Sequence, residues 1–117
     1  MRVIFNAPES LGVNDEYKLK RVAVHEAGHA VVAELLEPES VNLISINPHG
    51  GDIGGFTSYN NNEHYFSSIS YMKERVVALL GGKAATEIVF METDVGCNSD
   101  MHRAFDIVER FVDNYCE

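Results

Sequence analysis

Hydrophobic residues recur at helical spacing in the first third of the chain, from Glu16 to about Glu37. They form two adjacent stripes, one made of Val24, Gly28, Val31 and Leu35 and the other of Val22, His29, Val32 and Leu36. Side chains three or four residues apart share one face of an α-helix, so these stripes predict a helix that is buried over a broad surface. We expect Pro38 to end it, because proline cannot continue the hydrogen-bond ladder and disfavours helix in the residue before it.

Two further helices are predicted in the second half of the chain. The first runs from Phe66 to about Met91, with apolar residues at helical spacing: Ile69, Met72, Val76, Leu79, Leu80, Ala84 and Ile88. Gly81-Gly82 interrupts this pattern and indicates either a break between two helices or a point of close helix packing. The last helix begins near Ser99, with Asn98 or Ser99 as its N-cap. Its predicted buried face consists of Met101, Phe105, Val108 and Val112.

Two short runs between the helices predict strands. Residues alternate from Val41 to Asn47, and Phe56 to Tyr59 offers a second extended run. The glycine-rich segment from Pro48 to Gly55 lies between them and predicts a turn, so the two runs should pair as a hairpin or small sheet. Residues 60–64 are polar and predict an exposed loop. The expected fold class is therefore mainly α with a small β-hairpin or sheet, an α+β fold.

Length and composition favour a single domain. A chain of 117 residues that is 45% hydrophobic can build one compact core. Residues 1–14 end in a segment rich in turn formers, which we interpret as a leader or loosely packed N-terminal arm. Residues 15–117 remain as the predicted domain.

Charge and cysteine content narrow the setting in which the protein works. Nine basic against eighteen acidic residues give a net charge of -9, which opposes binding to nucleic acid. Two cysteines, Cys97 and Cys116, are too few for a disulfide framework and fit a reducing compartment. Apolar residues never approach the run of about 20 that spans a bilayer, and the N-terminus does not resemble a signal peptide. We therefore expect a soluble, cytoplasmic protein without a nucleic-acid partner.

The segment that points to chemistry is His25-Glu26-Ala27-Gly28-His29. His25 and His29 lie one helical turn apart on the same face, so both imidazoles can bind one metal ion, for which zinc is the expected choice. Glu26 is rotated by roughly 100° from His25 and suits a general base that activates a zinc-bound water. The pattern predicts a zinc-dependent peptidase. The alternative is a chance spacing of two histidines around a glutamate, expected in about one chain in several hundred of this length.

A catalytic zinc normally takes three protein ligands, and this helix supplies two. Candidates for the third are His49, His64, His102, Asp100 and several other carboxylates, and spacing does not choose among them. Cys97 is a further candidate, although an ordinary buried thiol is the expected reading. His102 follows Asp100 by two residues and would point away from it on a helix, so we expect it to face solvent. His49 and His64 are expected in exposed loops.

Four segments of the sequence, all within a region from about Lys20 to Val112, carry a resemblance to a known protein family. They are Val24 to Ala30, Val41 to Pro48 with the following Gly55-Phe56-Thr57, Leu80 to Ala85, and Gly96 to Asp100. Together they resemble the protease domain of the FtsH family of membrane-anchored, ATP-dependent zinc metalloproteases. The resemblance implies an FtsH-type peptidase domain that is short at its C-terminus. It also implies Asp100 as the third zinc ligand beside His25 and His29, and a small β element whose edge holds an extended substrate.

The resemblance sets further expectations about activity and partners. It implies a metalloendopeptidase that cleaves unfolded or loosely structured polypeptides. The chain has no Gly-x-x-x-x-Gly-Lys-Ser/Thr loop, since Gly82-Lys83 is followed by Ala84, so an ATPase partner or a missing ATPase domain is expected. Relatives carry the protease on the cytoplasmic side of the membrane, and a homo-oligomer is a further expectation.

This sequence departs from the family pattern at several positions. Val95 and Cys97 stand where the family has threonine and alanine, Asn98 and Ser99 are exchanged, and Thr86 replaces a glutamate. The alternative function is therefore a catalytically weak binding or regulatory module with a retained zinc site. A hydrolase of another small amide is a third hypothesis. The retained Glu26 favours the peptidase, because a structural zinc site needs no base and usually has four protein ligands.

Overall fold

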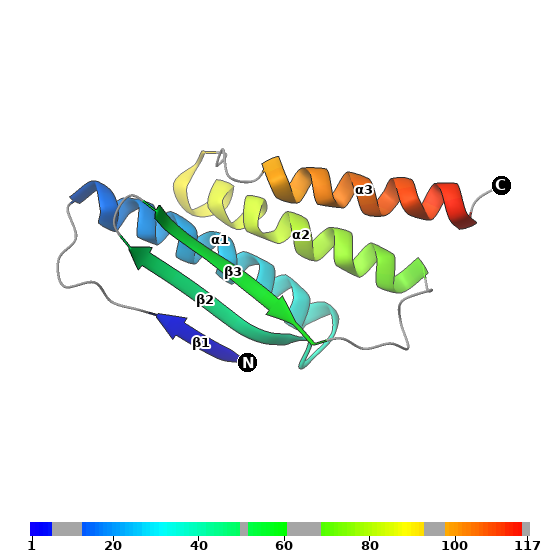
Figure 1. Ribbon diagram of the computed structural model, residues 1–117, viewed down its shortest axis with the longest axis horizontal. Coiled ribbons are helices and arrows are strands. Elements are labelled where there is room, and N and C mark those ends of the chain that lie inside the picture. The colour runs from blue at the N-terminus through cyan, green and yellow to red at the C-terminus, as the bar shows by residue number, and fades with distance from the viewer. Residues whose placement is uncertain (6–12, 50–51, 61–68, 93–97, 116–117) are drawn as a thin grey trace.

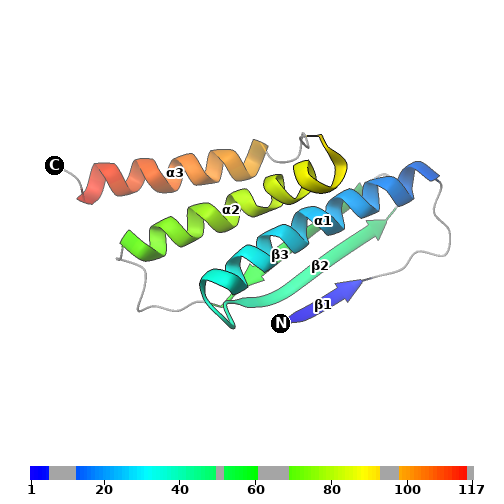
Figure 2. The same ribbon diagram turned by 180° about the vertical axis from the view of Figure 1, so that it is seen from behind.

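In the part of the chain that the structure describes, three helices lie side by side and a small sheet packs against the first of them (Figure 1, Figure 2). The computed structural model describes residues 1–5, 13–49, 52–60, 69–92 and 98–115. Its elements are β1 (Arg2–Phe5), α1 (Val13–Leu36), β2 (Val41–His49), β3 (Asp52–Tyr59), α2 (Ile69–Phe90) and α3 (Asn98–Tyr115). The predicted fold class, mainly α with a small β element, is confirmed.

The sheet has the strand order β1-β2-β3, so β3 forms one of its edges. β2 and β3 pair antiparallel as the predicted hairpin, with Ile44 opposite Thr57 and Ile46 opposite Gly55. β1 adds a parallel strand, in which Arg2 pairs with Leu43. The hydrophobic pattern did not predict β1, because four residues are too few to display an alternation. The boundary at residue 14 stays a prediction, but a loosely packed arm does not describe Arg2–Phe5.

The core lies where α1 meets the sheet and α2. Its buried residues come from those three parts of the fold: Ala30, Ala33, Val41, Ile44, Ile46 and Ala78. The residues from α1 are alanines, whose small side chains let the sheet and α2 come close to the helix. This close approach fixes the distance between α1 and β3, which matters for the site described below.

α1 and α2 run antiparallel and touch at glycines (Figure 1). A Cβ atom at Gly81 would lie 2.7 Å from the Gly28 carbonyl oxygen, and one at Gly28 would lie 2.6 Å from the Ala85 Cβ. Neither position has room for a side chain. α2 continues without interruption through Gly81-Gly82, so of the two readings of this pair, close helix packing is correct.

The predicted burial of several helix faces was wrong. On α1, Val31 and Leu35 are 58% and 80% exposed, so this helix is not buried over a broad surface. On α3, Phe105 and Val112 are 66% and 48% exposed, and Val108 is also exposed. The reason is that α3 packs mainly on α2, which leaves the outer faces of the helices uncovered among the described residues.

Some predictions fall outside the described residues. They include most of the exposed loop at 60–64 with His64, and Cys97. None of the helices within the described ranges is long and apolar enough to cross a membrane.

Candidate metal centre

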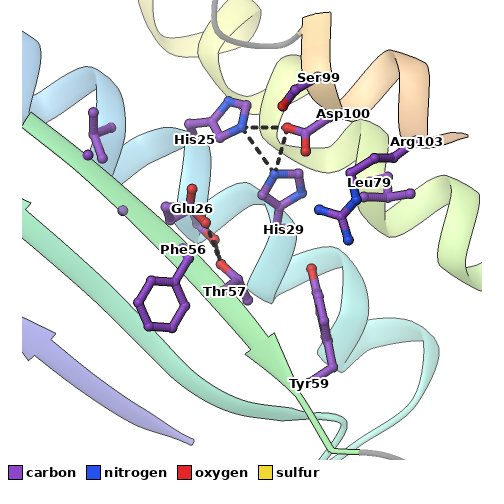
Figure 3. Close-up of a pocket in the computed structure, with 13 residues that line it drawn as sticks. His25, Glu26, His29, Phe56, Thr57, Tyr59, Leu79, Ser99, Asp100 and Arg103 are labelled. Carbon is purple, nitrogen blue, oxygen red and sulfur yellow. Dashed lines mark hydrogen bonds and ion pairs between the residues drawn. The ribbon is translucent and has the colours of Figure 1, made fainter.

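His25 and His29 lie on the face of α1 that points toward α3 (Figure 3). They are one helical turn apart, and their Nε2 atoms are separated by 3.1 Å. The two rings are nearly perpendicular, with an angle of 86° between their planes. This arrangement aims both Nε2 lone pairs at one point, as the spacing of the motif predicted.

Asp100 reaches the same point from the first turn of α3. Its Oδ2 atom is 2.8 Å from His25 Nε2 and 3.1 Å from His29 Nε2. The carboxylate suits this position, because the N-terminus of a helix carries a partial positive charge. His29 and Asp100 are buried and His25 is mostly buried, so solvent screens the cluster only weakly. The three predicted ligands are thus brought together from segments more than 70 residues apart.

The second ring nitrogen of His29, Nδ1, contacts the backbone of α2. His29 Nδ1 is 2.7 Å from the Ala78 carbonyl oxygen on α2. A carbonyl oxygen can only accept a hydrogen bond, so Nδ1 donates to it, and in the tautomer that binds a metal Nε2 therefore has the free lone pair. Metal-ligating histidines are oriented by hydrogen bonds of this kind. His25 Nδ1 is buried and has no hydrogen-bond partner among the described residues.

The spacing of these atoms fits a small tetrahedral ion. Ligand atoms about 2.0–2.1 Å from a tetrahedral zinc are about 3.3 Å apart. The observed separations of 2.8, 3.1 and 3.1 Å are slightly shorter, so a small outward movement of the side chains accommodates the ion. Gly82 of α2 leaves the space open, because a Cβ there would lie 2.8 Å from His25 Nε2 and 2.7 Å from His29 Nε2.

The Glu26 side chain extends toward β3 and lines the same cleft as the three ligands (Figure 3). The Thr57 hydroxyl donates a hydrogen bond of 2.7 Å to Glu26 Oε2. Glu26 is only 7% exposed, so this bond satisfies an acceptor that water reaches poorly. Glu26 is therefore beside the predicted metal ligands without belonging to them.

A cleft of about 390 Å³ opens beside these residues. Its walls come from α1, β3, α2 and α3 and include Gly54, Gly55, Phe56, Thr57, Tyr59, Leu79 and Arg103. The Tyr59 side chain points into this region (Figure 3). Burial raises the pKa of Tyr59 above its usual value, although the nearby Arg75 guanidinium opposes that rise. Tyr59 thus stays a neutral hydroxyl at physiological pH.

The chain is also similar to known proteins. The model of Peptidase family M41 matches residues 12–116. The chain belongs to peptidase family M41. A similar protein from Methylococcus capsulatus, named "ATP-dependent zinc metalloprotease FtsH", is 39% identical over 102 residues, which cover 86% of this chain and 16% of that protein. The FtsH resemblance seen in the sequence is thereby confirmed.

Other M41 relatives are similar over nearly the whole chain. "ATP-dependent zinc metalloprotease FtsH 1" of Thermoanaerobacter sp. is 38% identical over 97% of this chain and 19% of its own length. "ATP-dependent zinc metalloprotease FtsH" of Bacillus subtilis is 32% identical over 97% of this chain and 18% of its own length. The chain therefore spans less than a fifth of the length of these M41 relatives.

The structure also places the remaining candidate ligands. His102 is exposed, as predicted for a side chain that points away from the site. His49 is the last residue of β2 and not part of a loop, and its side chain lies outside what the structure describes. Three contributors were not recognised in the sequence as parts of the site: Thr57, Gly82 and the Ala78 carbonyl. The Gly81-Gly82 pair could have identified Gly82 as a point of close packing. A single threonine in a strand, by contrast, has no sequence pattern that marks it as part of a site.

Proposed function

We propose that this M41 chain is a zinc-dependent metalloendopeptidase domain that hydrolyses peptide bonds of unfolded or loosely structured proteins. The observation that carries the proposal is the convergence of His25, His29 and Asp100 on one point beside Glu26. The names of the relatives, which call them zinc metalloproteases, support zinc as the metal.

Three side chains would hold the zinc, namely His25 and His29 through Nε2 and Asp100 through Oδ2. Three protein ligands leave one tetrahedral position open, which is typical of catalytic and not of structural zinc. When bound, zinc would supply a Lewis acid that polarises the peptide carbonyl and acidifies water. The hydrogen bond from His29 Nδ1 to the Ala78 carbonyl keeps that ring in the tautomer and orientation that ligation needs.

Glu26 would act as the general base and then as the general acid. Its Oε2 atom already accepts the hydrogen bond from Thr57, so Oε1 remains available to take a proton from the attacking water. The same carboxyl group would then deliver the proton to the leaving nitrogen of the cleaved peptide. A group of this kind typically contributes about 10²–10⁴-fold to the rate.

The edge strand β3 offers a place for the substrate backbone. β3 pairs only with β2 in the sheet order of the described strands, and its residues Gly54 to Thr57 line the cleft. An extended peptide can add to such an edge through main-chain hydrogen bonds, whatever its sequence. Folded proteins cannot pair in this way, so we expect the domain to need unfolded substrates. Because the relatives are named ATP-dependent, we infer that an ATPase module, in the same longer protein or in a partner, delivers them.

The first test combines metal analysis with cleavage of unfolded casein. We expect about one zinc per chain by mass spectrometry, and cleavage by the wild type. Glu26→Gln should retain zinc and lose activity by about 10²-fold or more, because the base is removed while the three ligands stay. Glu16→Gln, a substitution at an exposed position of the same helix, is the matched control and should cleave casein normally. Zinc binding without cleavage by the wild type would favour a binding or regulatory module, and absence of zinc would refute the proposal.

A further inference from the structure

The Glu26 carboxylate is held by a single side chain of β3. Among the described residues, Thr57 is the one side chain that donates a hydrogen bond to it, at 2.7 Å. The same hydroxyl is 3.2 Å from the Glu26 carbonyl oxygen. A hydroxyl has one proton, and the shorter bond to a charged oxygen is the stronger of the two. The proton of Thr57 is therefore directed at the carboxylate.

Gly55 completes the slot in which Glu26 lies. Residues two apart in a strand face the same side of a sheet, so Gly55 and Thr57 both face α1. A Cβ atom at Gly55 would lie 3.2 Å from Glu26 Cγ and 3.0 Å from Val22 Cγ1. The absence of a side chain at Gly55 thus admits the stem of Glu26, while Thr57 binds its end. Gly55 and Thr57, which lie next to each other on the same face of β3, together fix the path of the Glu26 side chain from α1.

We propose that Thr57 is a positioning residue that fixes the orientation of the Glu26 carboxylate for catalysis. This inference rests on the proposed peptidase function. A free glutamate side chain loses conformational entropy when it must adopt one orientation. The hydrogen bond from Thr57 offsets this entropy cost when the protein folds. Glu26 is therefore already oriented before the substrate binds. In this role Thr57 acts through Glu26 and exchanges no proton with the substrate.

The location of Thr57 on β3 gives this role a further consequence. β3 is the edge strand that lines the cleft, and in its register with β2 Thr57 lies opposite Ile44. A peptide that adds to this edge would be placed by the same strand that places the base. The scissile bond and Glu26 would then both be positioned by β3, so their relative position would vary little.

The test compares Thr57→Val with Thr57→Ser on an unfolded, fluorogenic peptide, using the zinc-loaded protein. Valine keeps the β-branched shape but removes the hydroxyl, so we expect kcat to fall by about 10- to 100-fold, as for the loss of a hydrogen bond to a charged group. KM and zinc content should change less than about twofold, since valine keeps the shape of this part of the cleft and the backbone of β3, and no metal ligand is altered. Serine keeps the hydroxyl and should recover most of kcat. Ser58→Ala, whose side chain faces the other side of β3, is the control.

A second measurement does not depend on activity. In the metal-free protein, Thr57→Val should lower the melting temperature by a few degrees, but by much less in a Glu26→Ala background, where the hydrogen-bond partner is gone. Equal shifts in both backgrounds would overturn the inference, as would a wild-type kcat in Thr57→Val of an active enzyme. If the wild type itself binds no zinc or cleaves nothing, the proposed function fails, and the coupling in melting temperature still decides whether Thr57 holds Glu26.

Discussion

At Gly82 the backbone of α2 packs directly against the histidines that would bind the metal, because glycine has no side chain. A Cβ at this position would lie 2.7 Å from both His25 Cε1 and His29 Nε2. Real Cβ atoms do not approach heavy atoms that closely, so a side chain would displace both imidazoles or fill the space between them. α2 therefore takes part in the site through the absence of a side chain.

We predict that Gly82→Ala weakens zinc binding by at least about tenfold, the loss expected when the residues that orient the ligands are disturbed. Alanine favours helix over glycine by about 1 kcal/mol, so the protein should still fold. Competition with a chromogenic chelator measures the affinity. Gly54→Ala is the matched control, since a Cβ there would meet nothing within 4 Å. Unchanged affinity in Gly82→Ala would mean that the metal does not bind between these two histidines.

The residues of the site differ in how far the sequence could predict them. His25, Glu26 and His29 follow from local spacing, because a helix alone determines which side chains share a face. Asp100 was selected only by the resemblance to a family, since its approach to His29 across 71 residues depends on the packing of α3. Thr57 and the Ala78 carbonyl were missed for the same reason. Each acts on the site through a tertiary contact that no local pattern specifies.

Glu34, near the end of α1, links this helix to the start of β2 through hydrogen bonds. Its two carboxylate oxygens accept hydrogen bonds of 2.9 Å from the backbone N–H groups of Val41 and Glu39. These bonds, with that of Val41 the larger cause, lower the pKa of Glu34 below its usual 4.5. Between them the chain reverses through Glu39, whose φ of 67° is in the left-handed region that non-glycine residues seldom adopt. The two hydrogen bonds of Glu34 therefore stabilise a turn whose backbone conformation is unfavourable by itself.

We predict that Glu34→Gln lowers the melting temperature at neutral pH, because glutamine has one acceptor oxygen where the carboxylate has two. The contribution of a carboxylate with a depressed pKa is complete above its unfolded pKa, near 4.5, and is lost as the pH falls through the lower pKa of the folded state. The difference between wild type and variant should thus shrink as the pH is lowered below 4.5. Thermal melts across that range test this. Glu109→Gln on the exposed face of α3 is the control, and a difference that persists in acid would contradict the assignment.

The elements themselves were largely predictable, but their exposure was not. Helical periodicity identified each of the helices that the described residues form, and the glycine-rich turn identified the β2–β3 hairpin. Periodicity reports that a helix has an apolar face and does not report what covers it. Phe105 and Leu35, for example, lie on such faces and are 66% and 80% exposed. β1 was missed because its four residues are too few to display an alternation, and its pairing of Arg2 with Leu43 is a long-range contact that no local pattern specifies.

Of the three described helices, α3 has the weakest attachment to the rest of the molecule. It packs mainly on α2, and among its described residues only Asp100 and Ala104 are buried. Asp100 also provides its contact with the histidines of α1. A metal bound by all three residues would join α1 to α3 directly. Zinc is therefore expected to stabilise the position of α3 more than that of the other helices.

We predict that removing zinc with a chelator raises amide hydrogen exchange in α3 more than in α1 or α2, because little apolar burial holds α3 once the shared ligand is gone. Zinc at 100 times its dissociation constant should stabilise the folded state by about 2.7 kcal/mol, which the chelator would remove. Exchange measured by mass spectrometry resolves the helices separately. Asp100→Asn should show raised exchange in α3 with and without chelator, since one ligand is lost in both cases. Equal changes in all three helices would mean that the metal stabilises the domain without linking α1 to α3.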